Sequence, residues 1–230
     1  MGYKLLTQDM KTRKGELNET DWSDVGEWHE ATGTGGLCSD GVLHDYDDPW
    51  IAVVMNPAHA NIGNPVMYET ERGGRFLTDM LKCGSRRMRL LGRVDLPDIP
   101  LLQKVAFGIL AALEGYPYEK FRSWAMDWLS GKDRSASAAE AAVKVASAAR
   151  DAAAYVAARY AAAYAAAYDA AADADAAAIA ADAAYDAAAA ARAGNAAYAA
   201  AYAAAETADA ADMCKKIDWK RIKTEAMKIS

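Results

Sequence analysis

The run Tyr160-Ala-Ala-Ala-Tyr164-Ala-Ala-Ala-Tyr168-Asp169 is typical of residues 135–213, which are mostly alanine with interspersed tyrosine and aspartate. Alanine has the highest helix propensity of any residue, and the other common residues of this region tolerate a helix. None of these frequent side chains suggests a nucleophile or a metal cage. The region is therefore predicted to be helical and to serve as architecture.

The start and end of this helical region have recognisable signals. Ser137-Ala-Ala-Glu140 matches a capping box, and Gly194-Asn195 suits a left-handed helix C-cap. A single helix between them would be about 85–90 Å long, whereas aspartate clusters such as Asp173-Ala-Asp175 are an alternative, earlier break. We expect a helical hairpin or bundle with close alanine packing, in which Tyr164 and Tyr168 fill seams or bind partners.

Residues 1–97 are predicted to form a small β-rich domain. Gly and Pro residues separate short, partly alternating segments that resemble strands. These segments are residues 3–7, 27–31, 66–70 and 87–91. Residues 33–36 and 72–74 are predicted turns. Asp48 should cap a helix that begins at Pro49 and ends at Asn56-Pro57.

The hydrophobic period changes to that of a helix after Pro100. Apolar residues then recur on one helical face as far as Gly115, and Pro117 can open a second helix. Residues 98–134 are therefore predicted to be a helical connector, followed by an Ala-rich helical region, residues 135–230, with a basic C-terminal end. The predicted fold class is α+β.

The charge is unevenly distributed along the chain. The formal net charge is −6, residues 135–213 have ten acids and four bases, and residues 214–230 have six bases and two acids. An acidic body argues against general nucleic-acid binding, which needs a basic face. The basic end is expected to dock on acidic helices, with a nucleic-acid or membrane role as the less favoured alternative.

Composition also predicts the compartment. Three cysteines, an odd number, do not form a secreted disulfide framework. The first residues lack the apolar run of a signal peptide, and Asp and Arg interrupt the alanine region too often for a membrane span. The chain is therefore predicted to be soluble and cytoplasmic, with no membrane contact.

Reactive residues are concentrated in the first domain. Cys38 and His44 lie six residues apart, and His29, His59 and Cys83 belong to the same domain. These residues could bind zinc, but structural zinc sites prefer a Cys-x2-Cys pair, which is absent. The favoured interpretation is a buried Cys38 and a His44 that bonds a turn carbonyl, with no metal and no cofactor.

Two catalytic hypotheses compete with that interpretation. In the first, Cys38 is a nucleophile activated by His44, whose ring Asp45 or Asp47 would orient. A Cys–His pair needs spatial contact, which the spacing permits but does not require.

The second catalytic hypothesis is a cleft for a nucleotide or NAD. His44, Tyr46 and Glu69 resemble the histidine, tyrosine and glutamate set of ADP-ribosyl-transferring enzymes. Their order along the chain is compatible with such a set, but they are common residues and no phosphate-binding loop accompanies them. The candidate catalytic residues are therefore His44, Tyr46 and Glu69, and an enzyme is the less favoured class.

Several motifs give the chain a family resemblance. The motifs are Cys38-x2-Gly41-x2-His44-x-Tyr46-x2-Pro49, Ala52, Asn56-Pro57-x-His59-Ala60, Leu81-Lys-Cys83-Gly84, Phe107-Gly-Ile-Leu110 and Trp128-Leu-Ser-Gly-x-Asp133-Arg134-Ser135. With them, the chain resembles a family of bacteriophage and prophage proteins that also end in Ala-rich tails with interspersed aromatic residues. The resemblance covers most of the chain, and it implies a phage origin rather than a particular reaction.

The resulting functional prediction is a phage-encoded accessory protein that binds a host or phage protein. Inhibition of a bacterial defence component is one such role, with the Ala-rich helices as a scaffold or homo-oligomerisation arm. The candidate binding residues are Cys38, His44, Tyr46, Trp50, His59, Tyr164 and Tyr168. A structural or virion protein is a further alternative. An ice-binding face is disfavoured because tyrosine and aspartate recur on several helix faces.

Overall fold

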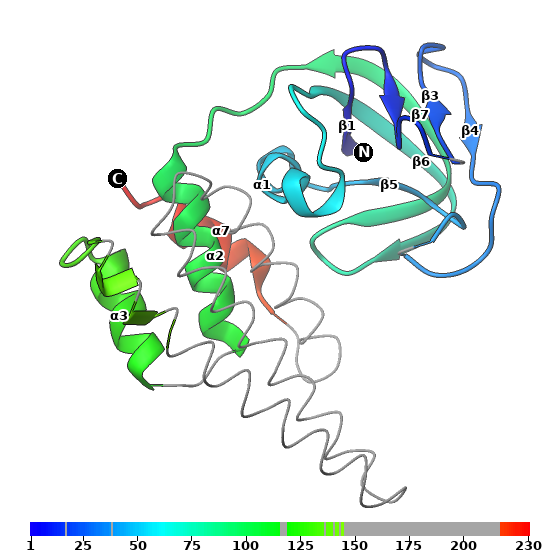
Figure 1. The fold of residues 1–230 in the computed structure, drawn as a ribbon. Helices are drawn as coiled ribbons and strands as arrows, with labels where there is room; N and C mark the ends of the chain where they lie inside the picture. Colours follow the sequence, from blue (N-terminus) through cyan, green and yellow to red (C-terminus); the bar gives the residue numbers. More distant parts are fainter. Residues whose placement is uncertain are drawn as a thin grey trace, which may run out of the picture. The chain divides into compact units, whose positions relative to one another are not determined.

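The computed structural model describes residues 1–16, 18–37, 39–115, 119–135, 137–139, 141–142, 144 and 217–230. The chain divides into two compact units, Met1–Ile99 and Pro100–Ser230. The first unit contains an antiparallel sheet and a helix, and the described part of the second is helical (Figure 1). The fold is therefore α+β, as the sequence predicts.

A long antiparallel hairpin of β6 (Val66–Thr78) and β7 (Cys83–Val94) is the centre of the first unit. The turn predicted at residues 72–74 is wrong, because residues 72 and 73 pair with β7 and the strand continues beyond them. The register shifts after Gly73, and Gly74 has a φ of 75°. Glycine tolerates such a positive φ, so the two glycines form an irregularity within the strand rather than a reversal of the chain.

The sheet closes on itself through a single bridge. β1 (Gly2–Leu6) pairs with β6, while β5 (Leu43–Asp45) and β4 (His29–Glu30) pair with the other edge of β7. The Tyr3 N–H donates to the Tyr46 carbonyl at 2.7 Å, and the Tyr46 N–H donates to the Tyr3 carbonyl at 2.9 Å. These two bonds join β1 to the chain just after β5, which gives the curled sheet of Figure 1.

A small hydrophobic core lies in the first unit beside a second, two-stranded sheet. The core cluster consists of Leu6, Trp22, Val66, Met88 and Leu90. The two-stranded sheet is formed by β2 (Lys11–Thr12) and β3 (Thr20–Asp21), and Trp22 follows β3 directly. The indole Nε1–H of Trp22 donates to the Thr12 hydroxyl at 3.0 Å, so this buried ring ties the second sheet to the core.

Helix α1 (Pro49–His59) begins as its sequence predicts. The Asp48 carboxylate accepts hydrogen bonds from the N–H groups of Trp50 at 2.8 Å and of Ile51 at 3.3 Å, and Pro49 occupies the first helical position. Five apolar side chains of the helix are buried: Trp50, Ile51, Ala52, Val54 and Met55.

The predicted end of this helix at Asn56-Pro57 is wrong. The helix passes through Pro57 and ends at His59. Proline disfavours the helical conformation of the preceding residue, but Asn56 is held from beyond the helix. Its side-chain amide donates to the Ile62 carbonyl at 2.9 Å and accepts from the Ile62 N–H at 3.1 Å. These two hydrogen bonds fix the path of the chain after the helix.

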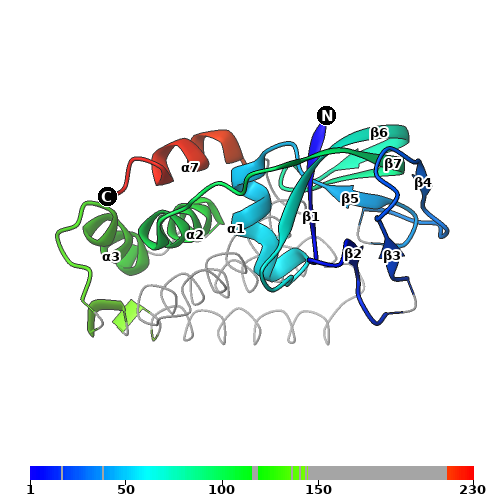
Figure 2. The same ribbon diagram turned by 90° about the horizontal axis from the view of Figure 1, so that it is seen from above.

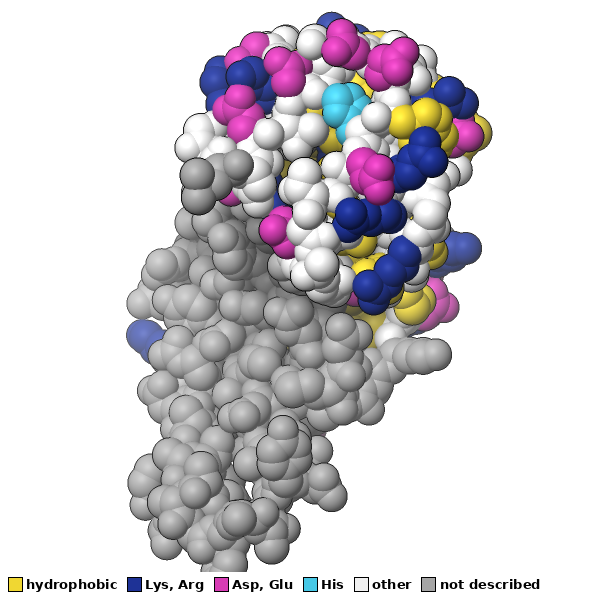
Figure 3. Space-filling view, turned by 90° about the vertical axis from the view of Figure 1, so that its right-hand side faces the viewer, with side chains coloured by type: hydrophobic (Ala, Val, Ile, Leu, Met, Phe, Trp, Pro, Cys, Tyr) yellow, Lys and Arg dark blue, Asp and Glu magenta, His cyan; other side chains and the backbone are white. Residues whose placement is uncertain are grey.

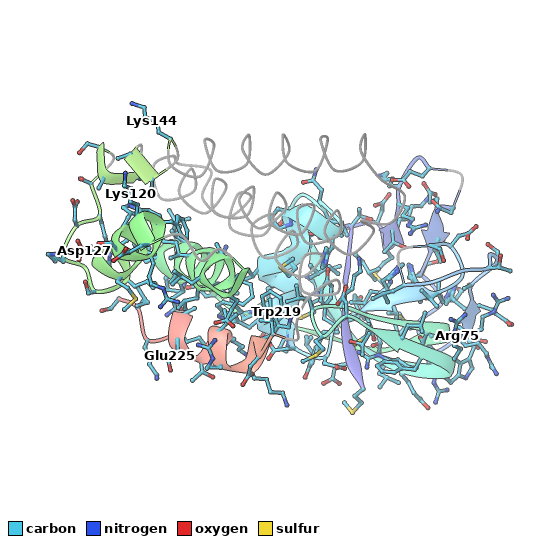
Figure 4. The ribbon with its side chains drawn as sticks, turned by 90° about the horizontal axis from the view of Figure 1, so that it is seen from below. Arg75, Lys120, Asp127, Lys144, Trp219 and Glu225 are labelled. Carbon is cyan, nitrogen blue, oxygen red and sulfur yellow. The ribbon has the colours of Figure 1, made fainter. Side chains whose placement is uncertain are left out.

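In the second unit, α7 (Trp219–Ala226) packs against α2 (Leu101–Gly115), as Figures 1 and 2 show. The Trp219 ring, labelled in Figure 4, lies 5.9 Å from the Phe107 ring, centre to centre. Arg221 pairs with Glu114. The basic end of the chain thus docks on a helix, largely through its apolar face. Helix α3 (Glu119–Leu129) also contacts α2.

The first residues of the Ala-rich region show where its helix begins. The Ser135 carbonyl accepts from the Ala139 N–H at 3.2 Å, and its hydroxyl accepts from the Ala138 N–H at 3.3 Å. Ser135 is therefore the N-cap, rather than Ser137 as the sequence predicts. The predicted helical hairpin and its break at residues 194–195 lie outside the described residues. In the part of the chain that is described, no helix has the length and apolar character to span a bilayer.

Candidate functional site

Three residues that the sequence selects meet at one cavity of the first unit. His44, Tyr46 and His59 all line a cleft of about 660 Å³ between the β2–β3 loop, the chain leading into β5 and the end of α1. We call it the His44 cleft. Its volume lies within the range of small-molecule sites, about 300–1,000 Å³. Residues far apart in the sequence therefore share a space that could hold a ligand.

His44 is a neutral histidine fixed to the backbone. It lies on β5, and its Nε2 bonds to the carbonyl oxygen of Leu37. Burial lowers the pKa of His44 to about 4, an effect to which the nearby cations Lys4, Lys82 and Arg13 add. The ring is thus uncharged near neutral pH, and its contact with a loop carbonyl is of the kind that the favoured sequence interpretation predicts.

Tyr46 and His59 form a stacked pair that joins the end of α1 to the chain after β5. Their ring centres are 5.9 Å apart at an interplanar angle of 14°, and the Tyr46 hydroxyl lies 3.1 Å from His59 Nδ1. Burial lowers the pKa of His59 to about 3 and raises the pKa of Tyr46. Both side chains are therefore neutral near pH 7, and the pair acts as a fixed wall of the cleft.

Lys4 is a site residue that sequence reasoning missed. Its Nζ donates to the His44 carbonyl at 2.6 Å and lies 4.6 Å from the centre of the Trp22 ring. Burial lowers the pKa of Lys4 to about 8, so the ammonium is mostly charged at neutral pH. The alternation of β1 could have revealed it, because Lys4 lies two residues before the buried Leu6 and so on the same face of the strand.

The remaining candidates of the first unit lie apart from the cleft or are buried. Glu69 is on β6, paired in register with Tyr3, and does not line the cleft. Trp50 is buried in α1. Cys83 is buried with its Sγ 3.7 Å from the Thr78 hydroxyl, and burial raises the pKa of its thiol to about 12. Such a thiol stays protonated and unreactive at neutral pH.

Other candidates lie outside the part of the chain that the structure describes: Cys38, Tyr164 and Tyr168. The zinc and cysteine-nucleophile hypotheses both depend on Cys38. Among the described residues, no group of three His, Cys, Asp or Glu side chains is arranged to hold a metal ion.

Asp45 and Asp47, the carboxylates considered as partners of the His44 ring, bind Arg72. The Arg72 Nε–H donates to both Asp45 oxygens at 2.8 Å, and its Nη1 donates to Asp47 at 2.6 Å. Thr70 adds a hydrogen bond from its hydroxyl to Asp45 at 2.5 Å. Burial raises the pKa of Asp45, an effect that Arg72 and Thr70 oppose. The two acids therefore anchor an arginine of the sheet.

A second feature of the first unit is an exposed tryptophan whose ring contacts two arginines. Trp28 is 36% exposed, and the guanidinium carbons of Arg87 and Arg89 lie 4.8 and 5.0 Å from the centre of its ring. The ring lies against Gly73, where an added Cβ would come within 3.2 Å of it. We call Trp28, Arg87 and Arg89 the Trp28 surface.

The charges around the Trp28 surface are partly paired. Arg89 donates to Glu71 through Nε at 2.8 Å and Nη2 at 2.6 Å, whereas no described carboxylate pairs with Arg87. Exposed apolar side chains lie close by in the sequence: Val25 precedes Trp28, and Leu91 follows Arg89 on β7. Figure 3 shows a face of the first unit on which basic, acidic and apolar side chains intermingle. This is a surface with both apolar and cationic character.

No protein-family model matches the chain, and comparisons with curated proteins and with solved structures found no similar protein.

Proposed function

We propose that this protein is a phage-encoded accessory protein that works by binding another protein through the Trp28 surface. The observation that carries the proposal is the partly exposed Trp28, over whose ring the guanidinium groups of Arg87 and Arg89 lie. Tryptophan and arginine are the residues most enriched among the hot spots of protein interfaces. A ring already held in place by two guanidinium groups also loses little conformational freedom when a partner binds.

The chemistry of the Trp28 surface indicates the partner. Arg87 can form an ion pair with a carboxylate of the partner. Trp28 with its apolar neighbours can pack against an apolar side chain of the partner. A nucleic acid fits less well, because residues 1–99 contain 16 Asp and Glu and 11 Lys and Arg. The expected partner is therefore a host or phage protein that presents an acidic residue beside an apolar one.

The biological setting of the proposal comes from the resemblance to bacteriophage and prophage proteins. The proposed interaction takes place in the cytoplasm of the bacterial host, with a component of a bacterial defence system as the proposed target. The Ala-rich region is proposed to form a helical hairpin or bundle that serves as a scaffold or homo-oligomerisation arm. High alanine content and the helix start at Ser135 support this role.

Replacing Trp28 by alanine is expected to weaken partner binding by about 30-fold or more, which corresponds to the loss of about 2 kcal/mol at a hot spot. The full chain would be cross-linked in a bacterial lysate, the partner identified by mass spectrometry, and the dissociation constant measured with the purified partner. Arg87→Glu should weaken binding as well, by removing the proposed contact with an acidic residue.

Two controls separate this surface from the rest of the first unit. Met80→Ala removes another exposed apolar side chain, 57% exposed, and should leave the dissociation constant unchanged. His44→Ala alters the cleft, and the purified variant should also keep the partner. Equal affinity of wild type and Trp28→Ala for every cross-linked protein would refute the proposal.

A further inference from the structure

The charges that line the His44 cleft are not evenly placed. Lys4, Arg13 and Lys82 all line it, and the Lys4 Nζ lies 2.6 Å from the His44 carbonyl oxygen. The positive charges of all three also lower the pKa of His44. They come from β1, from the loop after β2 and from the turn between β6 and β7. The side of the cleft at His44 is therefore a cationic wall built from separate parts of the first unit.

The acids of the cleft are engaged in part with other groups. Glu19 accepts hydrogen bonds from Lys11 and from the Gly15 N–H at 2.7 Å, and Glu30 lies 3.5 Å from Arg86. Two more acids, Glu16 and Asp40, also line the cleft. They can accept hydrogen bonds from hydroxyl or amino groups of a ligand.

We propose that the His44 cleft binds a small phosphate-bearing molecule, with the phosphate at Lys4, Arg13 and Lys82. Ammonium and guanidinium groups form charge-assisted hydrogen bonds with phosphate oxygens, which are about twice as strong as neutral ones. The stacked rings of Tyr46 and His59 line the same cleft and offer a flat aromatic surface. A cleft of about 660 Å³ has room for a nucleoside monophosphate as well as for a simple phosphate ester.

The proposal does not depend on catalysis or on the Trp28 surface. The site needs a charged wall and a cavity, and it uses neither Glu69 nor Cys38. Its failure would leave partner binding through Trp28 untouched, and the reverse also holds.

Isothermal titration calorimetry of the full chain with AMP, inorganic phosphate and adenosine tests the site. We expect AMP to bind, and each of the variants Lys82→Gln and Arg13→Gln to weaken its binding about tenfold, the effect of losing about 1.4 kcal/mol. Adenosine, which lacks the phosphate, should bind at least tenfold more weakly than AMP. If inorganic phosphate binds as tightly as AMP, the site recognises the phosphate group and not the nucleoside.

A matched control and a local readout keep the test specific. Lys14→Gln removes an exposed cation that pairs with Asp9 and does not line the cleft, so it should leave AMP binding unchanged. The ring NMR signals of His44 and His59, assigned with the variants His44→Gln and His59→Asn, should shift when AMP is added. The proposal is refuted if neither AMP nor phosphate binds, if adenosine binds as tightly as AMP, or if Lys82→Gln and Arg13→Gln both bind like the wild type.

Discussion

Replacing Arg72 by alanine is expected to lower the free energy of unfolding of the first unit by about 3–5 kcal/mol, the usual cost of removing one partner from a buried ion pair. The Asp45 side chain is fully buried, and the Arg72 Nε lies 2.8 Å from its carboxylate. Without the guanidinium, Asp45 must remain charged in the interior or take up a proton. Native-state hydrogen exchange of the amides of β6 and β7 would measure the loss in the full chain.

The carboxylate makes this effect depend on pH. If an unpaired Asp45 causes the loss, the difference between wild type and Arg72→Ala should shrink as the pH falls and the carboxyl is protonated. The exposed Arg75, labelled on the hairpin in Figure 4, supplies the control: Arg75→Ala should change the free energy by no more than about 0.5 kcal/mol. A loss that is equal for the two variants would contradict the assignment.

The same ion pair explains why one glycine is required. A Cβ at Gly2 would lie 2.2 Å from the Asp45 carboxylate and 2.3 Å from Arg72 Nη2. The start of β1 thus has to be glycine for the strand to approach the pair. Nothing local in Met1-Gly-Tyr-Lys reveals this, because the constraint comes from residues more than forty positions away.

The sequence predicts local features of this fold better than the features that depend on distant contacts. The cap at Asp48 and the helix that ends at Gly115 follow from nearby residues, and both are confirmed. The predicted turn at residues 72–74 is wrong because pairing with β7 overrides the local preference of two glycines. The predicted helix end at Pro57 is wrong because Asn56 is held by Ile62, beyond the helix.

In the candidate site too, the local features could be predicted and the features that depend on distant contacts could not. His44, Tyr46 and His59 could be selected as residue types, and His44 contacts a loop carbonyl as expected. Their common cleft could not be predicted, since it depends on how α1 ends beside β5. Lys4 was missed because a lysine in a short strand is usually read as a solvent-exposed residue, whereas here the closure of the sheet buries it.

Acidification from pH 7 to pH 5 is expected to lower the free energy of unfolding by about 2 kcal/mol for each of His44 and His59. The pKa values of the folded state, about 4 for His44 and about 3 for His59, lie below the ordinary value of 6.5. Below pH 6.5 the unfolded chain therefore binds protons that the folded chain does not, and stability falls as the pH falls. The loss continues until the pH reaches the folded-state pKa values.

Two substitutions isolate this contribution. In His44→Gln the side-chain amide can replace Nε2 at the Leu37 carbonyl, and in His59→Asn it can replace Nδ1 at the Tyr46 hydroxyl. Neither amide titrates, so each variant should lose about 2 kcal/mol less than the wild type between pH 7 and pH 5. Urea unfolding followed by NMR signals of β6 and β7 would measure this difference.

The comparison at two pH values also tests the origin of the histidine pKa values. A variant that is less stable than the wild type at pH 7 but equally sensitive to acid would mean that the ring is protonated in the folded state too. The free-energy cost of burying a protonated ring would then be smaller than its buried position indicates, and His44 could carry a positive charge beside Lys4 and Lys82. A reduced acid sensitivity in both variants would instead establish that the cleft is lined by two neutral imidazoles near neutral pH, so that its cationic wall consists of lysine and arginine alone.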